Sequence, residues 1–181
     1  MWHYSILRAG LAVTPAPILV AAVSGPAGKL ATKYGFRLVL LAGTACFVAG
    51  LLCYALLVGT HSDYITRWLP GTVLCGLGIG LTFPVLGAAA VSSLHPERFA
   101  VGSAVNQTAR QVGGAVGVAL LVVILGTPAS AAAALAPARH LWVYCAVMAG
   151  ASGLAALGIG RPSASAVGIA PSEPVLDAAA A

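Results

Sequence analysis

The sequence predicts an all-α membrane protein that crosses the lipid bilayer with five helices. Apolar residues make up 60% of the chain, charged residues make up 7%, and the mean hydropathy is +0.98. Soluble domains average roughly 45–50% apolar and 25% charged residues. The apolar residues also gather into long stretches, each close to the roughly 20 residues with which a helix crosses a bilayer.

The chain divides into a transmembrane region, 1–162, and a Pro-, Ser- and Ala-rich segment, 163–181, predicted to be a disordered cytoplasmic tail. Strands of a membrane barrel are not expected, because they would be about 10 residues long and would alternate apolar with polar side chains. The five predicted spans run approximately over Ser5–Gly28, Leu38–Gly59, Trp68–Val91, Val105–Gly126 and Leu141–Gly160.

The first span contains two prolines near its beginning, Pro15 and Pro17, with Thr14 beside them. A proline inside a helix frees a backbone carbonyl and can bend the helix. In a membrane this is tolerated where neighbouring helices or a water-filled cavity satisfy the freed group. We therefore expect Thr14, Pro15 and Pro17 to shape the outer end of a substrate path.

The connection after the first span sets the predicted orientation. It contains Lys29, Lys33 and Arg37 and no acidic residue, while the connection between the second and third spans nearly balances its charges. Basic connections face the cytoplasm in membrane proteins. This predicts a plasma-membrane protein with the Lys29–Arg37 connection and the C-terminus in the cytoplasm and the N-terminus outside.

Small residues recur at helical spacing in the second, third and fourth spans. Gly76 and Gly80 form a G-x-x-x-G pattern in the third span, and Gly113 and Gly117 repeat it in the fourth. Such seams let helix backbones approach closely in lipid. We interpret these glycines as helix-packing positions; the alternative is that Gly and Ala are simply scattered through an apolar chain.

A polar cluster opens the fourth span. Ser103, Asn106, Arg110, Gly113 and Gly117 fall on one helical face, flanked by Gln107, Thr108 and Gln111. If the span starts near Val105, Arg110 lies about 7 Å inside it, at 1.5 Å per residue. One interpretation is an arginine that extends back to the membrane surface. The other is that Asn106, Gln107 and Arg110 line a cavity or gate between helices.

Several functions are not indicated. The sequence has no phosphate-binding loop and no zinc-protease motif, its four histidines lie far apart, and its four cysteines show no C-x-x-C spacing. The basic residues lie at the ends of apolar runs, which does not favour nucleic-acid binding. We expect no enzyme, metal or cofactor. None of the predicted spans contains Asp or Glu, so a proton-coupling carboxylate would have to lie outside this chain.

Two stretches resemble the major facilitator superfamily. Gly28-Lys-Leu-Ala-Thr-Lys-Tyr-Gly-Phe-Arg37 resembles its cytoplasmic loop signature, G-x-L-A-D-R-x-G-R-[RK], through Gly28, Lys33, Gly35 and Arg37 among others, with Thr32 in place of the usual Asp. Gly102-Ser-Ala-Val-Asn-Gln-Thr-Ala-Arg-Gln-Val-Gly-Gly-Ala-Val-Gly-Val-Ala119 is similar to the segment that opens the thirteenth helix of fourteen-helix drug:proton antiporters of the EmrB/QacA type.

This resemblance implies that the chain forms part of the C-terminal bundle of a major facilitator fold, with roughly nine preceding helices absent. It implies efflux of hydrophobic or cationic drugs in exchange for protons by alternating access. Lys33 and Arg37 would anchor a cytoplasmic gate loop. The expected partners are the bilayer, the missing helices or another membrane chain, a small-molecule substrate and protons. The alternative is a small non-transporting membrane protein that packs against the helices of another chain.

Overall fold

The computed structural model describes residues 6–59, 63–92, 94–126, 130 and 133–158, so the predicted tail, 163–181, lies outside the described residues. All regular elements in the described part are helical, which confirms the predicted all-α class. In chain order they are α1 (Ile6–Val13), α2 (Pro15–Tyr34), α3 (Phe36–Leu57), a π-helical turn η1 (Tyr64–Trp68), α4 (Leu69–Val91), a 3-10 turn η2 (Pro96–Arg98), α5 (Phe99–Leu125) and α6 (Leu135–Ala156).

Four helical segments of the described chain are long and apolar enough to cross a membrane: Ala9–Tyr34, Phe36–Leu57, Tyr64–Val91 and Phe99–Leu125. They correspond to the first four predicted spans. The fifth predicted span lies in α6, a helix of 22 residues whose first turns contain Pro137, Arg139 and His140. These residues lower its hydropathy, so a fifth membrane crossing remains a prediction.

The α3 and α4 helices lie in backbone contact along one glycine-lined interface. A Cβ added to Gly78 of α4 would lie 2.6 Å from both Cβ and the backbone N of Phe47 in α3, and 2.8 Å from the Gly43 carbonyl oxygen. A Cβ added to Gly50 of α3 would lie 2.8 Å from the backbone N of Cys75. Real side-chain carbons do not approach so closely, so these positions of the interface require glycine.

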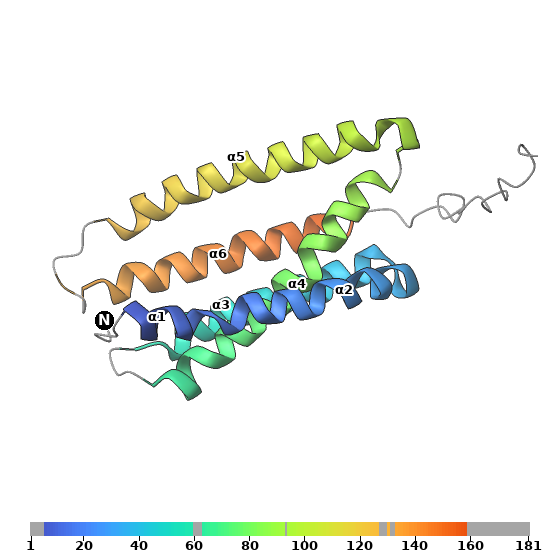
Figure 1. The fold of residues 1–181 in the computed structure, drawn as a ribbon. Coiled ribbons are helices and arrows are strands. Elements are labelled where there is room, and N and C mark those ends of the chain that lie inside the picture. Colours follow the sequence, from blue (N-terminus) through green and yellow to red (C-terminus); the bar gives the residue numbers. More distant parts are fainter. Residues whose placement is uncertain (1–5, 60–62, 93, 127–129, 131–132, 159–181) are drawn as a thin grey trace, which may run out of the picture.

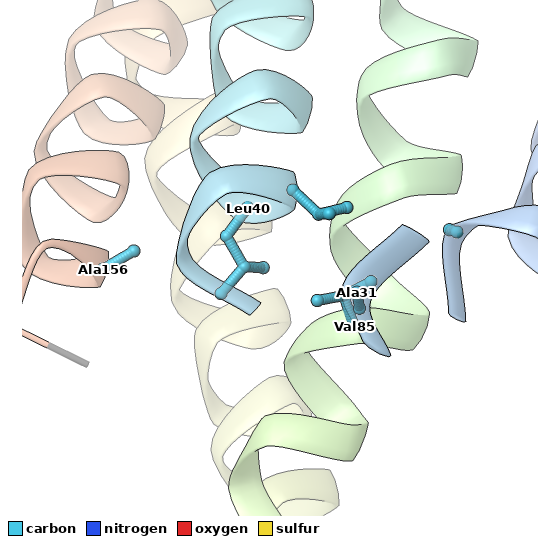
Figure 2. Packing of buried hydrophobic residues seen from close by; sticks show 6 residues of the cluster. Ala31, Leu40, Val85 and Ala156 are labelled. Carbon is cyan, nitrogen blue, oxygen red and sulfur yellow. The ribbon is translucent and has the colours of Figure 1, made fainter. Parts of the chain in front are cut away.

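The buried core lies where α2, α3, α4 and α6 meet. Figure 2 shows Leu40 of α3 between Ala156 of α6 on one side and Ala31 of α2 with Val85 of α4 on the other. Leu40 and Val85 are each 1% exposed. Small residues on α2 and α6 let these helices approach the larger side chains of α3 and α4. The core thus holds four helices in one group.

Near the start of α4, aromatic side chains connect the helices of this group. The Tyr54 ring of α3 lies 4.7 Å from the Trp68 ring and 5.8 Å from the Trp142 ring of α6, measured between centroids. Thr72 Oγ1 donates to the Trp68 carbonyl at 3.0 Å, so the Tyr54 hydroxyl is the donor in its 2.8 Å hydrogen bond to Thr72 Oγ1. This cluster links α3, η1, α4 and α6.

The α5 helix stands apart from the group (Figure 1). It contains no buried residue, although it is as apolar as a membrane span. Its exposed residues include Val105, Val116, Val118 and Val123, the last with 77% of its surface exposed. A helix with such a surface is stable in lipid or against further helices.

Candidate functional site

An open pocket of about 480 Å³ lies between α4 and α5, a volume within the range of small-molecule sites. Phe83 of α4 forms one wall. The other wall comes from α5, where positions spaced by three, four and seven residues share one face: Gln107, Arg110, Gln111 and Gly114. The pocket therefore combines one aromatic ring, two amides and one guanidinium.

Arg110 is held across the pocket by Phe83. Its Cζ atom lies 4.5 Å from the centre of the Phe83 ring, a cation–π contact between α5 and α4. An arginine near the middle of a membrane helix costs roughly 2.5–3.5 kcal/mol on insertion scales, and a cation–π contact returns about 0.5–2 kcal/mol. Within the described part of the chain no carboxylate pairs with Arg110. The contact offsets only part of the cost, so a further interaction partner is expected.

Arg110 lies well inside α5 rather than at its start. The helix begins at Phe99, six residues before the predicted Val105, so Arg110 lies eleven residues from its start, or about 16 Å. Arg110 is two positions before the midpoint of α5, and its head group turns sideways to α4 rather than along the helix axis. The guanidinium of Arg110 thus lies beside α4, where it lines the pocket.

The structure brings together only part of the predicted gate. Gln107 and Arg110 line the pocket, whereas Asn106 is half-buried beside it, 4.0 Å from a Cβ added to Gly87 of α4. Thr14, Pro15 and Pro17 lie on another helix pair and do not line this pocket. There Thr14 interrupts the α1–α2 helix and its Oγ1 donates to the Gly10 carbonyl at 2.8 Å.

The predicted cytoplasmic connection, Lys29–Arg37, is mostly helical in the structure. Gly28 and Lys33 belong to α2, Arg37 belongs to the first turn of α3, and Gly35 alone separates the two helices. Residues 29–34 contain no turn former, so α2 continues until Gly35. Gly35 adopts a φ of +87°, which glycine reaches without the strain of a side chain, and ends the helix.

The four glycines predicted to pack helices fall into two groups. Added Cβ atoms on Gly76 and Gly80 of α4 would each lie 3.1 Å from a Cβ of α2, on Leu19 and Val23 respectively, so these glycines face α2. Added Cβ atoms on Gly113 and Gly117 of α5 would meet no atom within 4 Å in the described structure. A packing role for these two remains a prediction that requires partners not present here.

Sequence reasoning missed Phe83. It is one aromatic residue in a Gly- and Ala-rich helix, and nothing in its spacing connects it with α5. The residue that follows is Pro84, whose ring removes a hydrogen bond from α4 and allows a bend there. An aromatic residue next to a proline inside a membrane helix is a signal that could have marked this position.

The four membrane-length apolar helices of the described chain define the class: a multi-pass membrane protein. Comparison with protein families gives the finer assignment. The family model described as Major Facilitator Superfamily matches residues 2–118, so the chain belongs to this superfamily. Membership in a transporter family confirms the prediction that the chain is not an enzyme.

Curated relatives carry transporter and resistance names. The chain is 31% identical over 123 residues to "Multidrug resistance protein B homolog" of Mycobacterium tuberculosis, covering 68% of this chain and 23% of the relative. It is 31% identical over 121 residues to "Probable actinorhodin transporter" of Streptomyces coelicolor, covering 65% and 21%. It is 34% identical over 120 residues to "Puromycin resistance protein pur8" of Streptomyces alboniger, covering 65% and 24%.

The chain thus spans about a quarter of the length of these relatives. No solved structure shows a significant match.

Proposed function

We propose that the chain forms the C-terminal five helices of a drug-efflux transporter of the EmrB/QacA type, which exchanges its substrate for protons. The observation that carries the proposal is the pocket between α4 and α5, with Arg110 near the middle of α5 and held against Phe83. A membrane protein retains a charged group at such a position chiefly for a function within the membrane. The names of the relatives supply the class of substrate.

The exposed surface of α5 supports the view that the chain works with further helices. Alternating access requires two helix bundles that move around a central site, and this chain contains one group of helices with α5 at its edge. The described spans contain no Asp or Glu, because Asp63 and Glu97 lie in the connections. The further helices would therefore supply the proton-coupling carboxylate as well as the opposite wall of the pocket.

The test uses everted membrane vesicles and a fluorescent drug. The chain alone is expected to transport nothing, whereas the chain together with a polypeptide of the preceding helices is expected to export the dye. A protonophore should stop this export. Arg110→Gln should reduce it about tenfold or more, the effect of losing one charged hydrogen-bonding group, and Arg98→Gln in η2 is the matched control.

Efflux by the chain alone would contradict the fragment hypothesis. A stable complex with the preceding helices that lacks efflux would instead favour the second candidate, a non-transporting partner protein. That candidate is favoured by the exposed apolar surface of α5, which fits packing against another chain.

The orientation is proposed from the basic residues Lys29, Lys33 and Arg37 around the α2–α3 junction, which lie on the cytoplasmic side of the plasma membrane in this proposal. A fluorescent protein that matures only in the cytoplasm, fused after Ala181, is expected to fluoresce. A periplasmic reporter fused at the same position is expected to stay inactive, and the reverse pattern would overturn the orientation.

A further inference from the structure

The charged and polar groups of the α4–α5 pocket indicate which class of substrate it would bind. This inference rests on the proposed function. Its lining contains one ionised group, the guanidinium of Arg110, and no carboxylate. The acidic residues of the described chain lie elsewhere: Asp63 pairs with Arg67 at 3.9 Å, and Glu97 is exposed in η2. Among the residues that line the pocket in the described chain, Arg110 alone is charged.

The hydrogen-bonding groups of the pocket favour the same kind of ligand. An arginine presents a planar set of N–H donors that matches carboxylate, sulfonate and carbonyl oxygens. Gln107 and Gln111 lie one turn apart on either side of Arg110, and their amide groups provide further donors. The described lining thus offers an excess of donors to an oxygen-bearing group.

The lining also offers an apolar surface to an aromatic group. The Phe83 ring provides an aromatic face on α4, and Gly114 presents no side chain on the opposite helix. The Arg110 guanidinium lies over the Phe83 ring, so a planar aromatic system would lie against the part of Phe83 that stays exposed, 43% of its surface, while its oxygen atoms approach Arg110. A cationic group in the same position would meet Arg110 at short range in surroundings of low polarity, where like charges repel strongly.

We propose that this pocket binds the anionic or oxygen-rich end of a planar aromatic compound and discriminates against cations. Arg110 acts as the specificity-determining residue, with Phe83 as the stacking face.

The test compares two dyes with the same xanthene skeleton and opposite charge, the anionic fluorescein and the cationic rhodamine 123. The full chain is placed in phosphatidylcholine nanodiscs, and binding is followed by fluorescence anisotropy against empty nanodiscs. Fluorescein is expected to bind at least about tenfold more tightly than rhodamine 123, the effect of a hydrogen bond to a charged group.

Three variants make the test specific. Arg110→Gln should abolish the preference for fluorescein, and Arg98→Gln, which removes the same charge from η2, should leave it unchanged. Phe83→Leu should weaken the binding of fluorescein but keep the preference for the anion. Circular dichroism establishes that each variant is as helical as the parent chain, and Phe83→Leu provides a second measurement should Arg110→Gln fail to fold.

Equal or tighter binding of rhodamine 123, unchanged fluorescein binding by folded Arg110→Gln, or no saturable binding of either dye would each overturn this inference. These outcomes are separate from the efflux experiment. Export of cationic dyes by the assembled transporter, with no anion preference in this chain, would leave the proposed function intact and reject the pocket's charge selectivity.

Discussion

Replacing Gly78 with alanine should separate α3 from α4. The new Cβ would lie 2.6 Å from Phe47 Cβ and from the Phe47 backbone N. Carbon atoms reach their best contact at about 3.5–4.0 Å, so the two helices must move apart by about 1 Å. Neither Phe47 atom can rotate away, because both belong to or adjoin the α3 backbone.

The cost of this separation follows from overpacking of a tight interface, about 1–3 kcal/mol in the free energy of unfolding. That is a sizeable share of a total stability of about 5–15 kcal/mol. The assay is denaturation of the chain in detergent micelles by increasing sodium dodecyl sulfate, followed by circular dichroism. Gly78→Ala should shift the midpoint of the unfolding transition clearly to a lower concentration of sodium dodecyl sulfate.

Gly25→Ala is the matched control, because a Cβ added to Gly25 of α2 would meet no atom within 4 Å. Its stability should equal or slightly exceed that of the parent, since alanine favours helix over glycine by about 1 kcal/mol. If Gly78→Ala and Gly25→Ala unfold at the same midpoint, α3 and α4 do not pack through this glycine, and the described interface is wrong.

The remaining predictions use the same unfolding measurement. Tyr54→Phe should lower stability by about 0.5–1.5 kcal/mol, because it removes one hydrogen bond to Thr72 and keeps the ring contacts; no change would show that this hydrogen bond does not stabilise the fold. Gly35→Ala should cost about 1–3 kcal/mol through its φ of +87° although no atom obstructs a Cβ there, and Gly28→Ala, unobstructed inside α2, is its control. Arg67→Gln should change stability by less than about 1 kcal/mol, since its 3.9 Å ion pair with Asp63 is exposed; a larger loss would reveal a structural role.

Much of the candidate site could be foreseen from the sequence. Arg110 and Gln107 stood out because charged and amide side chains are rare inside a membrane-length apolar helix. The predicted face was rotated, however. It passed through Gly113 and Gly117, whereas the pocket in the structure uses Gln111 and Gly114 of the same helix. Helical spacing groups residues into faces but does not state which face meets a neighbour.

The sequence by itself determined the helical membrane class and the approximate position of each helix. Hydropathy and helix length are properties of a local stretch, because every backbone group of a membrane helix is satisfied within that helix. The same local chemistry explains why α2 had to end at a glycine such as Gly35.

The tertiary structure alone decided which helices touch and through which residues. Glycines at helical spacing occur in α3, α4 and α5, yet Gly50 and Gly78 lie in backbone contact while Gly113 faces open space. The approach of Phe83 to Arg110 likewise joins two helices that no local pattern connects. Such contacts depend on how whole helices pack, and many packings share the same composition of small residues.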